Sequence, residues 1–90
     1  MIGTDLTMKE LEKLCNLKAY IVRDIVGNME AEAHDRPYED ALGLIESRAE
    51  DIQAVMLAPS RLATLIIYHN QYFSCSYEEF LSEFPNDLVR

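Results

Sequence analysis

Hydrophobic residues recur every three or four positions over most of the chain, which is the pattern of amphipathic helices. The first such segment begins near Thr7, where the spacing from Thr7 to Glu10 predicts a capping box. Its apolar residues fall on one wide face: Leu11, Leu14, Cys15, Ile21, Val22, Ile25 and Met29. The pattern predicts a helix to about Ala33, although Gly27 and Asn28 favour a bend or an early end.

A second helix is predicted to start at Asp35-Arg36-Pro37, because proline fits the first turn of a helix, where its missing amide hydrogen is not needed. Apolar residues then alternate in steps of four and three, which predicts a narrow packing seam: Tyr38, Leu42, Ile45, Ala49, Ile52 and Met56. Pro59 cannot continue a helix and disfavours a helical Ala58. The second helix should therefore end near Leu57.

A third helix is predicted from about Ser60 to Phe73. Its apolar face comprises Leu62, Leu65, Ile66, Tyr72 and Phe73. The β-like run at residues 65–68 leaves a strand as the alternative. Ser76 and Glu79 have the spacing of a second capping box, so a short helix is expected over Tyr77–Phe84. Residues 86–90 show no clear pattern of a helix or a strand.

These elements predict an all-α fold, a compact bundle of three longer helices plus a short C-terminal helix, in a single helical domain over residues 1–90. Ninety residues suffice for one hydrophobic core and are too few for two. The first two helices should form an antiparallel pair, with the aromatic C-terminal part closing the core. The apolar face of the first helix is wide enough to need two neighbours within the fold, or one across a homodimer interface.

The net charge of −8 is unevenly distributed along the chain. Residues 30–51 hold eight acids against two bases, whereas residues 1–29 are neutral. Direct binding of nucleic acid requires the opposite sign of charge, so this class of function is disfavoured. A protein partner with a basic surface is expected instead.

The chain also bears on where the protein works. Cys15 and Cys75 lie too far apart in sequence to form a C-x-x-C pair and are interpreted as reduced thiols. The first residues lack a basic segment followed by an apolar run, and the most apolar stretch is too short to span a bilayer. We therefore expect a cytoplasmic protein without a membrane partner.

Acidic residues of the second helix form the first candidate binding surface. Glu39, Glu46 and Glu50 lie on one side of this helix, with Asp40 and Asp51 further around. Their spacings of about 10 and 6 Å along the axis resemble the spacing of phosphates on a nucleic-acid strand. These residues are predicted to bind a basic protein surface, with DNA mimicry as one form of such binding; the alternative is a solvated face that keeps the protein soluble.

Aromatic residues near the C-terminus form the second candidate surface: Tyr72, Tyr77, Phe80 and Phe84. Tyr and Phe supply a large contact area at little cost in rotamer entropy, so these residues could bind a partner or a second copy. The alternative is that they pack in the core.

Other polar residues suggest no chemistry. His69 is interpreted as a hydrogen-bonded histidine of the core or an interface, and Lys18 as a lysine whose stem packs while its ammonium reaches water or a carboxylate. Cys15 is expected to be a packed, inert thiol. Glu30 and His34 could share a metal only with further ligands, such as Glu46 or Glu50. No catalytic residue, metal site or cofactor is predicted.

The predicted function is therefore that of a small acidic protein-binding module, a stoichiometric adaptor, regulator or inhibitor. By analogy, a phage-encoded inhibitor of host machinery or an immunity protein has this character. The alternatives are a self-associating structural or assembly protein and, less favoured, a small metal-dependent helical enzyme.

Overall fold

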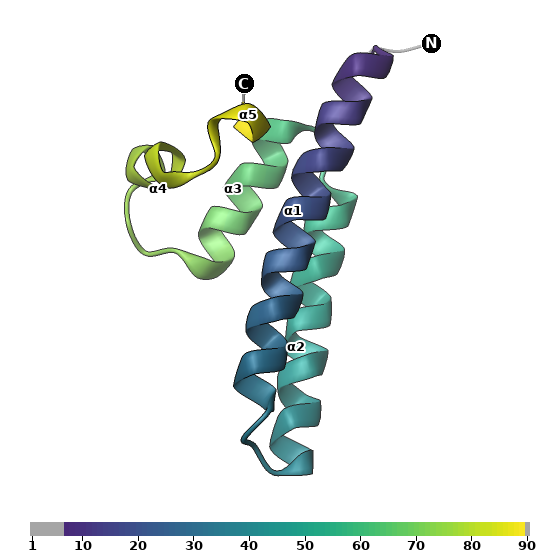
Figure 1. Ribbon diagram of the computed structural model, residues 1–90, viewed down its shortest axis with the longest axis vertical. Coiled ribbons are helices and arrows are strands. Elements are labelled where there is room, and N and C mark those ends of the chain that lie inside the picture. Colours follow the sequence, from purple (N-terminus) through teal and green to yellow (C-terminus); the bar gives the residue numbers. More distant parts are fainter. Residues whose placement is uncertain (1–6, 90) are drawn as a thin grey trace.

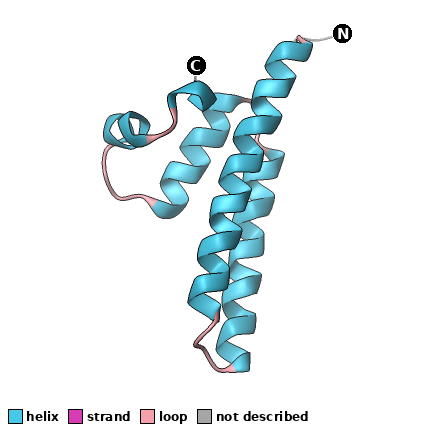
Figure 2. Ribbon diagram, in the orientation of Figure 1, coloured by secondary structure: helices cyan, strands magenta, loops and turns pink. Residues whose placement is uncertain are grey.

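The computed structural model describes residues 7–89, which contain five helices and no strand (Figures 1 and 2). The helices are α1 (Met8–Ala33), α2 (Tyr38–Leu57), α3 (Arg61–Tyr72), α4 (Tyr77–Glu83) and α5 (Asn86–Val89). The prediction of an all-α bundle with three longer helices and a short C-terminal helix is confirmed. The strand alternative for residues 65–68 is wrong, and α5 is a further short helix that the pattern did not indicate.

Local signals determine where α1 begins. Thr7 Oγ1 accepts a hydrogen bond from the backbone N–H of Glu10 at 3.1 Å, and the Glu10 side chain accepts one from the Thr7 backbone, which completes the predicted capping box. The helix continues through Gly27 to Ala33 without an early end. Packing of the apolar face against other helices compensates for the low helix propensity of glycine.

The break between α2 and α3 is where Pro59 predicted it. Ala58 has an extended backbone, and Ser60 caps α3 by accepting a hydrogen bond from the Ala63 N–H at 3.1 Å. The hydroxyl of the fully buried Thr64 donates to the Ser60 carbonyl at 2.7 Å. The chain can therefore turn sharply and lay α3 beside α1, while every polar group named here has a partner.

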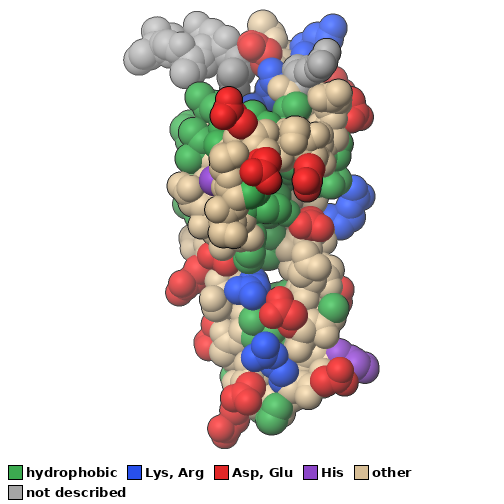
Figure 3. Space-filling model, turned by 90° about the vertical axis from the view of Figure 1, so that its left-hand side faces the viewer, with side chains coloured by type: hydrophobic (Ala, Val, Ile, Leu, Met, Phe, Trp, Pro, Cys, Tyr) green, Lys and Arg blue, Asp and Glu red, His purple; other side chains and the backbone are tan. Residues whose placement is uncertain are grey.

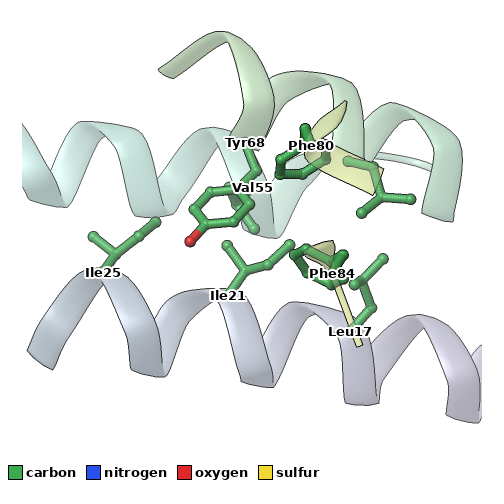
Figure 4. Close-up of a cluster of buried hydrophobic side chains, with 8 residues drawn as sticks. Leu17, Ile21, Ile25, Val55, Tyr68, Phe80 and Phe84 are labelled. Carbon is green, nitrogen blue, oxygen red and sulfur yellow. The ribbon is translucent and has the colours of Figure 1, made fainter. Parts of the chain in front are cut away.

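The hydrophobic core lies where α3, α4 and the end of α5 meet the α1–α2 pair (Figure 4). Leu17 and Ile21 of α1 and Val55 of α2 have no exposed surface. Their side chains point toward those contributed by the C-terminal half of the chain. The whole core cluster comprises Leu17, Ile21, Ile25, Val55, Leu65, Tyr68, Phe80 and Phe84.

The rotation of α2 about its axis differs from the prediction. Val55 is buried, and Ala41, Leu44 and Arg48 are half-buried toward the rest of the protein, whereas most of the predicted seam is exposed. A second set of residues, one position earlier in each turn, thus makes the packing contacts. The same kind of error affects α3, where Leu62 is 60% exposed and Tyr68 is buried.

The molecule is elongated because the third helix is short. α1 and α2 run antiparallel along the length of α2, and the N-terminal turns of α1 extend beyond it, while α3, α4 and α5 cover only the upper half of one side of the pair (Figure 1). The radius of gyration is 14.8 Å, against about 12 Å expected for a compact chain of this length. We call the α1–α2 pair the helical hairpin; among residues 7–89, no further helix covers its side opposite α3.

Candidate protein-docking site

The predicted acidic residues of α2 divide into two groups. Glu39, Glu46 and Glu50 are exposed on the outward side of the helix. Asp51 is half-buried and accepts a hydrogen bond from the Tyr72 hydroxyl, while its backbone carbonyl accepts one from Gln71 Nε2 at 3.0 Å. The inclusion of Asp51 in the docking surface is therefore wrong, because its carboxylate holds α3 against α2.

Asp40 is exposed but lies in the first turn of α2 together with Glu39. Carboxylates in this position interact favourably with the unpaired amide groups of a helix N-terminus. Asp40 thus has a local role in starting α2, and it lies further around the helix from the other exposed glutamates.

The presence of acidic side chains does not by itself distinguish the α2 surface from the rest of the protein. On the side that carries α3 and α4, acidic side chains occur from top to bottom, with basic side chains among them (Figure 3). Two of the bases, Arg36 and Arg48, are paired with Glu32 at 3.9 and 3.4 Å. A docking site on α2 needs a second distinguishing feature.

That feature is an exposed apolar row on α2, adjacent to the glutamates. Leu42, Ile45 and Met56 are 44%, 41% and 53% exposed, and Ala49 between them is exposed too. They repeat in steps of three, four and seven residues, so they share one side of the helix. This row is most of the seam predicted from the sequence, and the part of the chain that the structure describes leaves it uncovered.

α1 continues this apolar surface across the hairpin. A groove of about 510 Å³ is lined by Cys15, Ala19, Val22 and Val26 of α1 and by Met56 of α2, together with Lys18 and Arg23. Since Met56 belongs to both the groove and the α2 row, groove and row form one surface. We call it the hairpin groove; its apolar residues are Cys15, Ala19, Val22, Val26, Leu42, Ile45, Ala49 and Met56.

Lys18 lies in the floor of the hairpin groove, but its charge is directed into the protein. Its ammonium group donates hydrogen bonds to the backbone carbonyls of Met56 at 2.6 Å and Ala58 at 2.7 Å. These carbonyls at the C-terminal end of α2 carry the negative end of the helix dipole. The prediction of a packed stem is consistent with this position, but the ammonium binds carbonyls rather than a carboxylate.

The predicted aromatic surface is largely part of the core. Phe80 is 3% and Phe84 8% exposed, so the prediction that these two residues bind a partner is wrong, and the core-packing alternative holds for them. Phe84 packs edge-on against Tyr20 of α1, with ring centroids 5.3 Å apart. Tyr72 and Tyr77 are half-buried. The C-terminal segment folds back over α1 and α3, which removes its aromatic side from solvent.

His69 is half-buried among aromatic rings, in agreement with its interpretation as a hydrogen-bonded histidine. Its ring stacks against Phe73 with an interplanar angle of 7°, and the Tyr77 ring meets it edge-on. His69 Nε2 lies 2.7 Å from the Cys75 carbonyl oxygen. The histidine thus joins the end of α3 to the loop before α4.

A second hollow, of about 450 Å³, lies on the α3 side between the three longer helices. Tyr68 donates a hydrogen bond to Asp24 there, and the Arg48 guanidinium lies 5.4 Å from the centroid of the Tyr72 ring. Burial, followed by the hydrogen bond to a carboxylate, raises the pKa of both tyrosine hydroxyls well above the usual value of 10.0. They remain protonated near neutral pH, so they serve as hydrogen-bond donors rather than as bases.

Cys15 is exposed in the hairpin groove, so its interpretation as a packed thiol is wrong. The apolar face of α1 is wider than α2 and α3 together cover, and Cys15 lies on the uncovered part.

Glu30 and His34 are exposed near the end of α1. Within residues 7–89, no three His, Cys, Asp or Glu side chains gather as a metal site would require, and no helix is long and apolar enough to cross a membrane.

The fold and the groove define a class: an all-helical protein that presents an uncovered helical hairpin with an apolar groove and an acidic edge. Comparison of the chain with protein-family models, with curated proteins and with solved structures found no match.

Proposed function

We propose that this protein is a small acidic protein-binding module that acts as a stoichiometric adaptor, regulator or inhibitor of a protein with a basic surface. The observation that carries this proposal is the position of exposed Glu39, Glu46 and Glu50 beside the uncovered apolar row of α2. Interfaces combine an apolar centre with a polar edge, and the hairpin groove with its glutamates has this composition.

Charge and apolar area contribute differently to such an interaction. The glutamates would accelerate association with a basic partner and disfavour acidic ones. Burial of the exposed Leu, Ile and Met side chains would supply affinity, at about 25 cal/mol for each Å² removed from water. A partner that normally binds nucleic acid would offer a fitting basic surface, and binding to this module would then exclude the nucleic acid.

The test is binding to a purified basic candidate, selected by retention from lysate at low but not high salt, because salt screens exposed charge pairs. The variant Glu46→Lys/Glu50→Lys should weaken the interaction about tenfold or more. Glu78→Lys/Glu83→Lys, which makes the same change of charge at exposed positions of α4, is the matched control. Equal effects of the two variants would reject the α2 surface as the docking site.

Self-association is a second candidate function, and the uncovered hairpin groove is the observation that favours it. Contiguous exposed apolar surface on a soluble protein commonly marks an interface. Sedimentation equilibrium over a wide range of concentration would distinguish the two. A mass of about 20 kDa, twice the 10.3 kDa of the chain, that falls to the monomer value in Ile45→Glu would favour self-association.

A further inference from the structure

The hairpin groove has the length and shape of a seat for one helix. From Leu42 to Met56, α2 rises by about 21 Å, which corresponds to four turns. α1 runs beside α2 in the opposite direction, and Lys18 of α1 lies at the level of Met56, so the two helices form parallel walls (Figure 1). A groove between two packed helices accepts a third helix through residues spaced three, four and seven apart.

A partner can cover the floor of the groove without burying the Lys18 ammonium group unpaired. Two charged residues line the groove: Arg23, which is exposed, and Lys18, whose ammonium already donates to the carbonyls of Met56 and Ala58. Covering a lysine that pointed into the groove would remove an unpaired charge from water, which strongly opposes binding. The observed hydrogen bonds avoid most of this cost and leave the methylene stem as part of the apolar floor.

The edges of the groove determine which helix fits. Glu46 and Glu50 directly follow Ile45 and Ala49 of the α2 row, and Glu39 follows the exposed Tyr38. On α1, Arg23 lines the groove, and Glu12 and Glu30 are exposed at helical spacing before and after it. The α2 edge carries three acids, so Lys or Arg beside the apolar row of a partner helix would find opposite charges along α2, whereas the acidic α2 edge of a second copy of this chain would meet acid there.

We propose that the hairpin groove binds a basic amphipathic helix of another protein, one with an apolar row flanked by Lys or Arg. The inference rests on the proposed function and specifies the partner element that this face recognises. The partner helix lies along the groove as the third member of a local three-helix arrangement. Its apolar row contacts Val22, Val26 and Ile45, and its basic side chains lie beside the glutamates.

The experiment uses the full chain and a synthetic helical peptide of about 18 residues, enough to span the groove. The peptide carries leucine at spacings of three and four, lysine elsewhere and one tryptophan. Because this protein has no tryptophan, the fluorescence of the peptide reports binding directly. A peptide of the same composition with a scrambled order lacks the apolar row, and one with glutamate in place of lysine lacks the positive charge.

Two variants of this protein form a matched pair. Ile45 in the groove and Ile66 on α3 are both 41% exposed, so replacement by glutamate makes the same chemical change at the same exposure. We expect Ile45→Glu to weaken binding of the Leu/Lys peptide about tenfold or more, since a carboxylate would be buried against leucine. Ile66→Glu should change the affinity about twofold at most. Circular dichroism verifies that both variants are folded.

Thiol protection gives a readout that does not depend on charge. In Cys75→Ser, the remaining thiol Cys15 lies in the groove, and the saturating peptide should slow its reaction with a maleimide about tenfold. In Cys15→Ser, the rate at Cys75 should not change with peptide.

The outcomes separate this inference from the proposed function. Binding that requires the ordered apolar row, Ile45 and protection of Cys15 supports the helix seat. Binding that Glu46→Lys/Glu50→Lys weakens, but that is equal for the ordered and scrambled peptides and for Ile45→Glu and Ile66→Glu, would overturn the seat and leave an acidic docking surface. If neither charge reversal nor Ile45→Glu matters, both proposals fail. A dimer that Ile45→Glu dissociates would assign the groove to a second copy.

Discussion

The ammonium group of Lys18 lies 2.6 Å from the carbonyl oxygen of Met56 and connects the middle of α1 to the last turn of α2. The same nitrogen donates to Ala58 at 2.7 Å, so a cation on α1 satisfies carbonyls that the end of α2 leaves unpaired. This contact stabilises the hairpin at the point where the chain turns into α3. It also keeps the floor of the groove apolar.

Replacement of Lys18 by methionine should lower the free energy of unfolding by about 1–2 kcal/mol. The variant keeps the packed stem but removes a charged donor from two carbonyls. Urea unfolding followed by circular dichroism measures the effect. Lys9→Met, at an exposed position in the first turn of α1, is the control and should change stability by about 0.5 kcal/mol at most. Equal losses in the two variants would contradict the capping role of Lys18.

Leu17→Ala should destabilise the protein by about 2–5 kcal/mol. Leu17 of α1 is fully buried in the core with Phe80 and Phe84 of the C-terminal segment, so its truncation leaves a cavity. Leu62→Ala removes the same atoms from a side chain that is 60% exposed and should cost much less. Thermal unfolding compares the two, with about 4–8 °C expected for each kcal/mol. A similar melting temperature for both variants would show that the core lies elsewhere.

Gly27→Ala and Gly43→Ala should each stabilise the protein by about 0.5–1 kcal/mol. Both glycines lie inside helices, and a Cβ at either position would meet no atom within 4 Å. Alanine then gains helix propensity without a clash. The measurement is the urea midpoint with an unchanged slope. A loss of stability would mean that the added methyl group meets a neighbour in solution.

Stability should decline as the pH rises above about 10. Burial and hydrogen bonds to Asp24 and Asp51 raise the pKa of Tyr68 and Tyr72 above the 10.0 of an unfolded chain. Above that pH the unfolded state loses phenolic protons that the folded state retains, so the folded state loses relative stability until its own tyrosines ionise. Below pH 10 these two groups contribute no dependence on pH.

Urea unfolding between pH 8 and about pH 11 tests this sign. Tyr68→Phe and Tyr72→Phe should each flatten the decline, because phenylalanine has no proton to lose. Tyr38→Phe is the control, since Tyr38 is 79% exposed. An alkaline decline that persists unchanged in the Tyr68→Phe/Tyr72→Phe double variant would assign it to other groups.

The proposed docking site includes the apolar row of α2, which the sequence predicted as a packing seam and which is exposed in the fold. The steps of four and three along α2 correctly identified a helix with an apolar row, but the row faces solvent rather than α1 and α3. Sequence spacing identifies which residues share a side of a helix, and it does not determine which side the neighbouring helices cover.

What the sequence by itself determined is local. Thr7, Ser60 and Ser76 accept hydrogen bonds from amides three residues later, and Pro59 prevents helical continuation, whatever the rest of the chain does. Helix bounds and class therefore followed from residues within one turn of each other. Only the tertiary structure decided that Asp51 and Phe80 face inward while Cys15 and Ile45 face solvent. These exposures depend on how each helix is rotated against partners distant in sequence, where burial of apolar area across the whole fold outweighs any local preference.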